Sequence, residues 1–307
     1  MLPAPRPYTD ETDYWRIRAF LRELYRWHDR HEVNWSLLRW DYWRWHVHEN
    51  IFHFDLPSAV WLWEADGEIA AVLNADGPGE AFFQVHPARA WPGLEAAMLA
   101  GAERHLAATG PDGHRSLTVW VLDSDPARQT LLAAAGYAKS EGAEHIRRRP
   151  LPEPPAPIAP AAGYTVRALG DAAELPARSW LSWKVFHPDE PDSAYQGWEW
   201  YPNVQRGPLY RRDLDLVAVA PDGELAAFCT VWFDDVLRSA VFEPVGTHPA
   251  HQRRGLGKAV MTEGLRRAAR LGATVASVSS YSAGAHALYA SLGFADDLRS
   301  APWRKTW

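Results

Sequence analysis

The sequence predicts an α/β protein with two domains of similar size, each a sheet layered with helices. Three observations lead to this prediction: a proline-rich run in the middle of the chain, similarity between the two halves, and alternating strand-like and helix-like segments within each half. With 307 residues, the chain is long enough to give each of two domains its own core.

Composition excludes several classes of protein. Hydrophobic residues make up 47% of the chain and charged residues 23%, which is typical of a globular protein and not of a disordered one. With 32 basic and 38 acidic residues, the net charge of -6 does not suit a nucleic-acid-binding protein. There is no signal-peptide pattern, no apolar run long enough for a membrane span, and a single cysteine, Cys229. We therefore expect a cytoplasmic protein.

The run from Pro150 to Pro160 separates the two halves. Proline fixes φ and donates no backbone hydrogen bond, so such a run suits neither a helix interior nor a central strand. It predicts an extended linker. We expect a first domain over residues 1–149, a linker over residues 150–162 and a second domain over residues 163–307.

The two halves share three features in the same order, which predicts a tandem duplication. An Asp-Gly turn joins two apolar runs at Asp66-Gly67 and at Asp222-Gly223, and this pattern is typical of a β-hairpin. Residues 86–110 then align without a gap to residues 248–272, both beginning His-Pro-Ala. Finally, each half closes with a helical segment that ends in Gly followed by an aromatic residue.

Hydrophobic periodicity places the main elements. In the first half, apolar residues from Ile17 to His28 recur at helical spacing, and a second helical stretch follows from about Asn34. In the second half we expect strands over residues 216–220, 226–233, 240–247 and 274–279, and helices over residues 255–271 and 284–292.

A basic, glycine-containing segment begins the first of these two helices. It reads Pro249-Ala250-His251-Gln252-Arg253-Arg254-Gly255-Leu256-Gly257-Lys258. Backbone N–H groups at a helix start bind anions, glycine lets a phosphate approach the backbone, and the Arg and Lys side chains add positive charge. The segment is not a P-loop, because Gln252 and Ala259 stand where that loop needs Gly and Ser or Thr. It is not a dinucleotide fingerprint either, because Val260 replaces the third glycine.

The segment resembles the Gln/Arg-x-x-Gly-x-Gly/Ala loop of the GNAT acetyltransferase family. A second hallmark of that family, a helix ending in Leu-Tyr-x-x-x-Gly-Phe, appears here as Leu288 to Phe294. The resemblance covers about residues 163–307, and the first half matches in outline. The whole chain therefore resembles a tandem GNAT protein, with two domains that are each a mixed, mostly antiparallel twisted sheet flanked by helices.

This resemblance implies an N-acetyltransferase that moves an acetyl group directly from acetyl-CoA to an amine. The loop amides would hold the pyrophosphate, and an amide near Val245 would polarise the thioester carbonyl. Pro244 predicts a bulge that separates this strand from its neighbour, where the family places the cofactor. The residues implied in cofactor binding are Val245, Thr247, Gln252, Arg253, Arg254, Gly255, Leu256, Gly257, Lys258 and Ser282. Ser282 stands where the family often has Asn, and it can cap the helix.

Two residues are candidates for proton transfer. The resemblance implies Tyr289 as the general acid for the departing thiolate, and the alternative is a core tyrosine. Glu243 is the candidate base, since a carboxylate on this strand is a common base in the family, and the alternative is an ordinary surface carboxylate. Strand alternation puts Glu243 on the face of Val245 and Thr247, and His248 on the other face.

The first half lacks these features and is expected to be a degenerate copy without cofactor. Pro92 removes an amide donor at the loop position, and Glu95 replaces the second glycine with a carboxylate that would repel a pyrophosphate. Leu132 stands where Tyr289 stands in the second half. We expect this half to have a structural role.

The sequence gives weaker indications of a substrate site and of a metal site. The aromatic residues that precede the second hairpin, where the family places its acceptor-binding helices, are candidates for substrate contact: Trp180, Trp183, Trp198, Trp200 and Tyr201. Most tryptophans of the first half are expected in the core. The histidines of the first half have no ligand spacing, so no metal site is expected.

The acceptor is expected to be a small-molecule amine, and two alternatives stay open. A protein or peptide acceptor would predict an open groove lined with acidic residues such as Asp189, Glu190 and Asp192. The other alternative is an acyl-CoA-binding protein without turnover.

Overall fold

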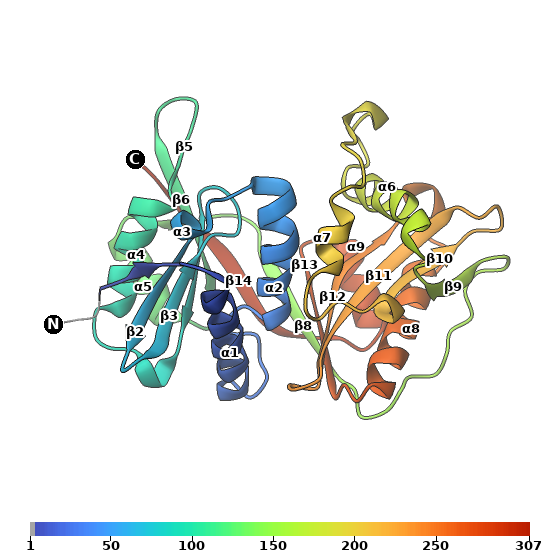
Figure 1. Cartoon of the computed structure of the whole chain (residues 1–307), viewed down its shortest axis with the longest axis horizontal. Helices are drawn as coiled ribbons and strands as arrows, with labels where there is room; N and C mark the ends of the chain where they lie inside the picture. The colour runs from blue at the N-terminus through green and yellow to red at the C-terminus, as the bar shows by residue number, and fades with distance from the viewer. Residues whose placement is uncertain (1–3) are drawn as a thin grey trace. The chain divides into compact units, whose positions relative to one another are not determined.

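The computed structural model describes residues 4–307 and divides the chain into two compact units (Figure 1). Unit 1 consists of the residues up to Ile146 together with Asp297–Trp307, and unit 2 consists of Arg147–Asp296. From the sequence we expect residues 163–307 to form a single domain. In the structure, the last eleven residues of the chain instead belong to unit 1, because the final strand pairs there.

Unit 1 contains five α-helices and a π-helix around a mixed sheet. The helices are α1 (Glu11–Trp27), α2 (Leu37–Tyr42), α3 (Leu56–Ala59), α4 (Leu94–His105) and α5 (Pro126–Ala134), and the π-helix is Trp43–Phe52. The strands are β1 (Arg6–Pro7), β2 (Val60–Ala65), β3 (Glu68–Asn74), β4 (Glu80–Val85), β5 (Ala108–Thr109), β6 (Arg115–Leu122) and β7 (Ala138–Lys139). Two further strands, β8 (Glu144–Pro150) and β14 (Ala295–Thr306), lead from one unit into the other.

The sheet of unit 1 has the strand order β1-β2-β3-β4-β6-β14. All neighbours are antiparallel except β4 and β6, which are parallel and are connected through α4. This mixed, mostly antiparallel arrangement is the one that the sequence predicted.

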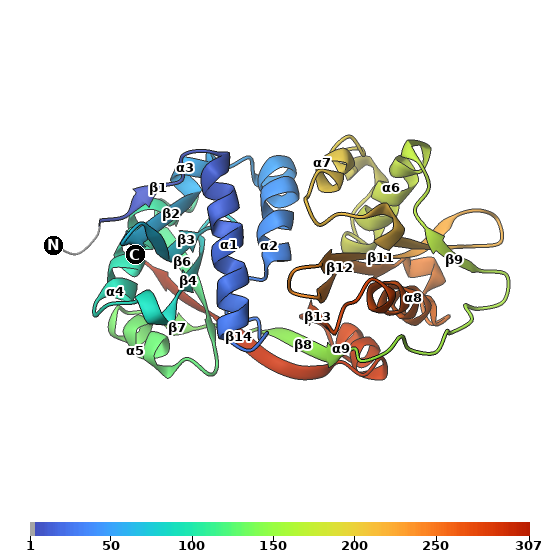
Figure 2. The ribbon, with the colours of Figure 1, turned by 60° about the horizontal axis from the view of Figure 1, so that its bottom comes forward.

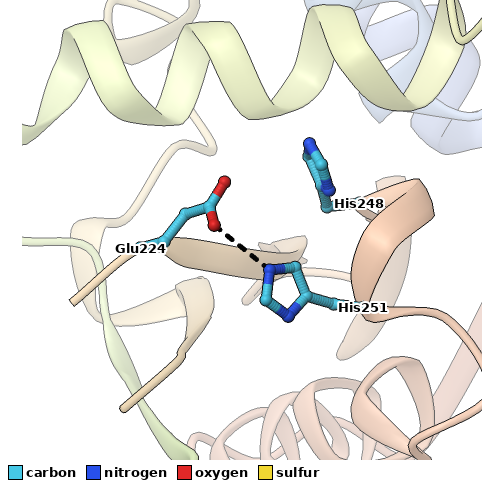
Figure 3. Close-up of side chains that lie close together, drawn as sticks. All are labelled: Glu224, His248 and His251. Atoms are coloured by element: carbon cyan, nitrogen blue, oxygen red, sulfur yellow. Dashed lines mark hydrogen bonds and ion pairs between the residues drawn. The ribbon is translucent and has the colours of Figure 1, made fainter. Parts of the chain in front are cut away.

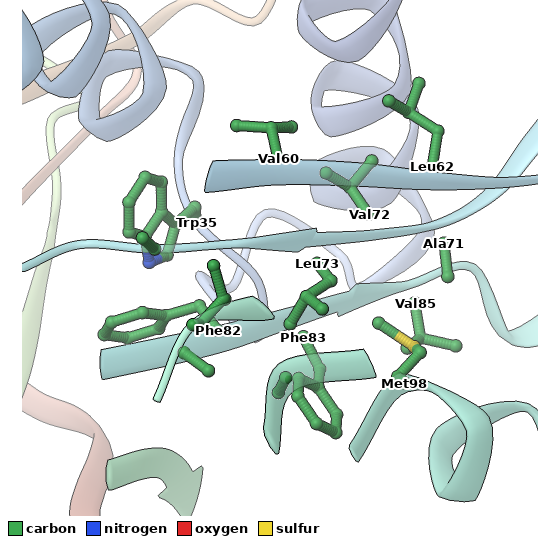
Figure 4. Close-up of a cluster of buried hydrophobic side chains, with 14 of the residues drawn as sticks. Trp35, Val60, Leu62, Ala71, Val72, Leu73, Phe82, Phe83, Val85 and Met98 are labelled. Atoms are coloured by element: carbon green, nitrogen blue, oxygen red, sulfur yellow. The ribbon is translucent and has the colours of Figure 1, made fainter. Parts of the chain in front are cut away.

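The core of unit 1 forms between α1 and the sheet. The apolar residues of α1 that set its helical period, including Ile17, Leu21 and Leu24, are all buried. They join the side chains from β2, β3, β4 and α4 that Figure 4 shows. Most of the early tryptophans are in this core, as expected, whereas Trp15 and Trp27 are 51% and 54% exposed.

Unit 2 repeats the same plan. Its helices are α6 (Leu175–Phe186), α7 (Tyr201–Gln205), α8 (Leu256–Arg270) and α9 (Ala283–Ser291). Its strands are β9 (Thr165–Ala168), β10 (Asp215–Val219), β11 (Leu225–Asp234), β12 (Ser239–Thr247) and β13 (Val275–Ser280), in the order β9-β10-β11-β12-β13. Only β12 and β13 are parallel. Each element that the sequence predicted between residues 216 and 292 is present to within one residue at both ends.

The sheet of unit 2 is covered on both faces, and this arrangement positions the candidate site. Figure 2 shows α6 and α8 on opposite sides of β11. One face packs against α8 and α9 through residues such as Val260 and Leu265, and the other packs against α6 and α7 around Phe228. Gly264 is required where α8 crosses the sheet, because a Cβ there would lie 2.8 Å from the Val231 side chain and 2.9 Å from Phe242.

Residues 151–164 form neither helix nor strand. This segment is tied to unit 2 at two points: Leu151 N–H donates to the carbonyl of Thr274, and Arg266 donates to the carbonyl of Pro155 over 2.8 Å. Across residues 4–307, no helix combines the length and the apolar character needed to cross a membrane.

Candidate active site

The start of α8 in unit 2 presents a row of backbone N–H groups. The loop before it has two residues with positive φ, Arg253 at 65° and Gly255 at 74°. The first helical hydrogen bond runs from Ala259 N–H to the carbonyl of Gly255, which caps the helix without a side-chain bond. From Arg253 to Lys258, no backbone N–H has an acceptor within residues 4–307. These donors, with the positive end of the helix dipole, form a site suited to an anion.

A bulge interrupts β12 just before this loop, as Pro244 predicted. Along β11 the pairing advances two residues, from Cys229 to Val231, while along β12 it advances three, from Val245 to Phe242. The extra residue is therefore on β12, next to Pro244.

A gap also opens between β12 and β13. The two strands pair only from Ser239 to Val241 on β12, and within the described chain no later residue of β12 pairs with β13. Val245 lies beyond the last pair, half-buried against the core that α8 and α9 share. The strands therefore part where the sequence predicted a separation.

Burial along β12 alternates as the sequence predicted. Glu243, Val245 and Thr247 are half-buried, whereas Pro244 and Gly246 between them are fully buried. Gly246 faces the side of the sheet that α6 and α7 cover. A Cβ at this position would come within 2.6 Å of Phe228 and of Val185, which is on α6. Thr247 faces α8, because a Cβ on Gly257 would lie 3.4 Å from its Oγ1.

Tyr289 on α9 is buried on the same side of the sheet as Val245. Burial raises the pKa of its hydroxyl, and the negative charge of Glu243 raises it further. Within residues 4–307 the Tyr289 hydroxyl makes no hydrogen bond to another side chain or to the backbone. Ser282 begins α9, where its Oγ accepts from Ala285 N–H over 3.3 Å, so its expected capping bond is confirmed.

The sequence of this chain matches known proteins. The family described as "Acetyltransferase (GNAT) family" matches residues 174–294. Mycothiol acetyltransferase from Kineococcus radiotolerans is 31% identical over 245 residues, which is 75% of each chain. The chain belongs to the GNAT acetyltransferase family.

Solved structures show that the GNAT fold extends over the whole chain. A GCN5-related N-acetyltransferase from Sphaerobacter thermophilus superposes with a TM-score of 0.70 at 20% identity, covering 100% of this chain and 97% of the other. A tandem GNAT protein from the clavulanic acid biosynthesis pathway gives a TM-score of 0.67 at 17% identity, covering 99% and 98%. The tandem arrangement that the sequence indicated is therefore confirmed.

The first GNAT unit has the same strand plan but a different helix start. Its parallel strands also pair briefly, with Glu80 opposite Thr118 and Ala81 opposite Val119. At the start of α4, however, the carboxylate of Glu95 accepts two hydrogen bonds from Arg128, of 2.8 and 2.9 Å. The Arg128 guanidinium also lies over the ring of Phe83. In unit 1 the Glu95–Arg128 ion pair therefore occupies the helix start, the position at which unit 2 has the backbone N–H groups of Arg253 to Lys258.

The helices on the other face of unit 2 carry the aromatic residues that the sequence singled out. Trp180 and Trp183 on α6 are half-buried and stack with ring centroids 5.4 Å apart, and Tyr195 contacts both rings. Tyr201 does not fit the expectation of substrate contact. It is buried in the core, and its hydroxyl donates to Asp215 over 2.7 Å.

Sequence reasoning missed the polar network to which Tyr201 belongs. Asp215 is fully buried and accepts hydrogen bonds from Tyr201, Tyr210 and Thr230. The guanidinium of Arg178, 1% exposed, lies 3.6 Å from this carboxylate and donates to Thr230. The network joins α6 and α7 to β11 opposite the bulge. The apolar strand that follows Asp215 in the sequence is consistent with burial, but it does not predict the hydrogen-bond partners of this carboxylate.

A second polar cluster lies at the end of β12 (Figure 3). Glu224, His248 and His251 each offer a ligand-type atom within 4.8 Å of the others. His248 Nδ1 accepts from Ala250 N–H, and in unit 1 the aligned His86 accepts from Ala88 N–H in the same way. His248 therefore caps the turn after the strand, as the aligned His86 does in unit 1.

Proposed function

We propose that this GNAT protein transfers an acetyl group from acetyl-CoA to a primary amine of a small molecule, with its active site in unit 2. The observation that carries the proposal is the row of unpaired N–H groups from Arg253 to Lys258, next to the gap between β12 and β13. An anion-binding helix start beside an open strand edge suits a long ligand with a pyrophosphate at one end and a thioester at the other.

The donor would be held by residues on one side of the sheet. The pyrophosphate would be bound by the N–H groups of the loop Gln252–Lys258, with added charge from its two arginines and its lysine. Val245 and Thr247 would line the pantetheine arm, with Ser282 at the start of α9. Acetyl-CoA supplies an activated acyl group, and an amide near Val245 would stabilise the oxyanion that forms on its carbonyl.

Two side chains would move protons. The acceptor nitrogen forms a bond to the carbonyl carbon as the carbon–sulfur bond breaks. Glu243 would take the proton that the amine loses, and Tyr289 would give its proton to the departing sulfur. The raised pKa of Tyr289 means that its hydroxyl is protonated at neutral pH, which is the form that a proton donor needs.

A small-molecule acceptor is supported by two observations. The relative at 31% identity is named for a small molecule, mycothiol. One of the acidic residues that a basic peptide would need is neutralised, because Lys184 pairs with Asp192 at 2.9 Å. This pair reduces the negative charge that the segment offers.

Unit 1 is proposed to bind no acetyl-CoA. The Glu95–Arg128 pair occupies the start of α4, and Leu132 stands in place of Tyr289. Unit 1 would then act as a structural copy.

Calorimetric titration with acetyl-CoA tests the proposal. We expect one site per chain, and two sites would contradict the assignment of unit 1. No binding at millimolar ligand would overturn the acetyltransferase proposal for this chain. If acetyl-CoA binds but no amine in a broad panel releases free thiol, the chain is an acyl-CoA-binding protein without turnover.

A further inference from the structure

His251, the residue immediately before the loop Gln252–Lys258, is held from both sides. Its Nδ1 lies 2.8 Å from the hydroxyl of Tyr164, and its Nε2 lies 3.2 Å from the carboxylate of Glu224. Tyr164 comes from the segment after the proline-rich run and is buried, whereas Glu224 comes from the β10–β11 turn and is exposed. Both partners are far from His251 in the sequence and meet it only in the folded unit.

The hydrogen bonds indicate that Tyr164 and Glu224 hold His251 in place, an arrangement that we call the clamp. They do not suit a metal site in this cluster. A carboxylate accepts, so His251 Nε2 carries a hydrogen that it donates to Glu224. His248 Nδ1 accepts from Ala250 N–H, so the hydrogen of its neutral ring is on Nε2. Burial lowers the pKa of His248, which keeps that ring neutral near pH 7. Both Nε2 atoms therefore carry a hydrogen and lack the lone pair that a metal needs.

The loop that follows is in a conformation that needs support. Arg253 has a φ of 65°, in the left-handed region that costs a residue with a Cβ roughly 1 kcal/mol or more. The corresponding loop of unit 1, residues 90–93, has positive φ only at its glycine, Gly93. In unit 2, Tyr164 supports both sides of the strained residue, because its hydroxyl bonds to His251 and its ring lies under the Arg254 guanidinium at 5.9 Å.

In unit 1 a carboxylate from α1 holds the corresponding turn. Glu23 accepts hydrogen bonds of 2.9 and 2.8 Å from Arg89, which aligns with His251, and one of its oxygens lies 3.2 Å from Nε2 of His86, which aligns with His248. A carboxylate that holds the turn after this strand is thus common to both units. The tyrosine and the left-handed arginine belong to unit 2, the unit with the open N–H groups.

We propose that Tyr164 and Glu224 are positioning residues for acetyl-CoA binding. By fixing His251, they hold the loop Gln252–Lys258 in its anion-binding conformation before the ligand arrives, which lowers the entropy lost on binding. This inference rests on the proposed function, since it assigns the loop to the pyrophosphate.

Two probes separate the clamp from a general effect on the fold. Acetyl-CoA carries the pyrophosphate, whereas acetylpantetheine has the same thioester arm without it. We expect Tyr164→Phe to raise the Kd for acetyl-CoA roughly fivefold, the effect of one lost hydrogen bond, and to leave the Kd for acetylpantetheine unchanged. Glu224→Ala should raise the Kd for acetyl-CoA about twofold, because its bond is exposed. Glu224→Gln keeps an acceptor oxygen and should bind as the wild type does.

Glu23→Ala is the control, because it removes the carboxylate that holds the corresponding turn of unit 1 and should leave both Kd values unchanged. If wild-type protein does not bind acetyl-CoA, the proposed function fails and the clamp proposal fails with it. If wild-type protein binds and Tyr164→Phe has the same Kd, only the clamp proposal is overturned. An equal loss of affinity for acetylpantetheine also overturns it, since the substitution would then act on the whole unit. Thermal unfolding of each variant shows that it is folded.

Discussion

The guanidinium of Arg128 holds the carboxylate of Glu95 at the first turn of α4, through two hydrogen bonds. In the second GNAT unit the aligned positions are Gly257 and Ala285, which carry no charge and almost no side chain. The two units share one strand plan and differ in what occupies the start of the crossover helix. In unit 1 it is an ion pair, and in unit 2 it is a row of open donors.

Gly257→Glu should therefore weaken acetyl-CoA binding in unit 2 strongly. It places a carboxylate at the pyrophosphate position without the arginine that neutralises Glu95 in unit 1. Like charges about 4 Å apart repel by roughly 4 kcal/mol at an effective dielectric constant near 20, so we expect the Kd to rise about 100-fold or more. Calorimetric titration measures this change.

Gly257→Ala is the control for the loss of the glycine itself. Its Cβ would lie 3.2 Å from Leu288 Cδ2 and 3.4 Å from Thr247 Oγ1, contacts that these side chains can relieve by small shifts. Binding should weaken no more than about tenfold. If the two variants bind equally well, charge at this position does not decide cofactor binding.

Tyr289→Phe should separate turnover from binding. The substitution removes the proposed proton donor but keeps the ring that packs in the core of unit 2, so we expect kcat to fall about 100-fold with little change in the Kd for acetyl-CoA. Because its pKa is raised, Tyr289 stays protonated through neutral and mildly alkaline pH. The kcat of wild-type protein should accordingly show no decline from this group below about pH 10. An unchanged kcat in Tyr289→Phe would leave Tyr289 as a core residue.

Local patterns in the sequence predicted most of the fold and the strand face that lines the candidate site. Strand alternation placed Glu243, Val245 and Thr247 on one half-buried face, and Pro244 marked the bulge, because both effects act within a few residues of the chain. Helix-start chemistry likewise located the loop before α8. These features depend on backbone geometry that neighbouring residues determine.

Partners that are distant in the sequence could not be predicted in this way. Tyr164 reaches His251 across 87 positions, and Arg178 meets Thr230 across 52. Periodicity reports that a residue is buried but not what it contacts, so Tyr201 was interpreted as a substrate contact although it bonds to Asp215 in the core. The pairing of β14 with β6 is a similar case, because a strand pattern does not specify which sheet the strand joins.

The buried network around Asp215 should be costly to break. Asp215→Asn removes the charge opposite Arg178, whose guanidinium is only 1% exposed and is therefore shielded from solvent. We expect the free energy of unfolding of unit 2 to fall by about 3 kcal/mol, measured by urea unfolding. Asp213→Asn is the control: its pair with Arg211 is on the surface, and its loss should cost less than about 1 kcal/mol. Equal effects of the two substitutions would show that burial does not govern the strength of this network.

The stability of unit 1 should depend on pH through Asp13. Burial acts to raise the pKa of this carboxyl, but hydrogen bonds from Arg6 and Thr9 outweigh it and lower the pKa to about 2. The folded pKa is below the unfolded one, so the contribution of Asp13 is complete above about pH 4 and is lost as pH falls toward 2. It amounts to about 2 kcal/mol. Urea unfolding from pH 6 to pH 3 should show about half of this loss, about 1 kcal/mol, in the wild type and a smaller one in Asp13→Asn. Glu68→Gln, at an exposed carboxylate, should keep the wild-type slope, and a wild-type slope in Asp13→Asn would contradict the assignment.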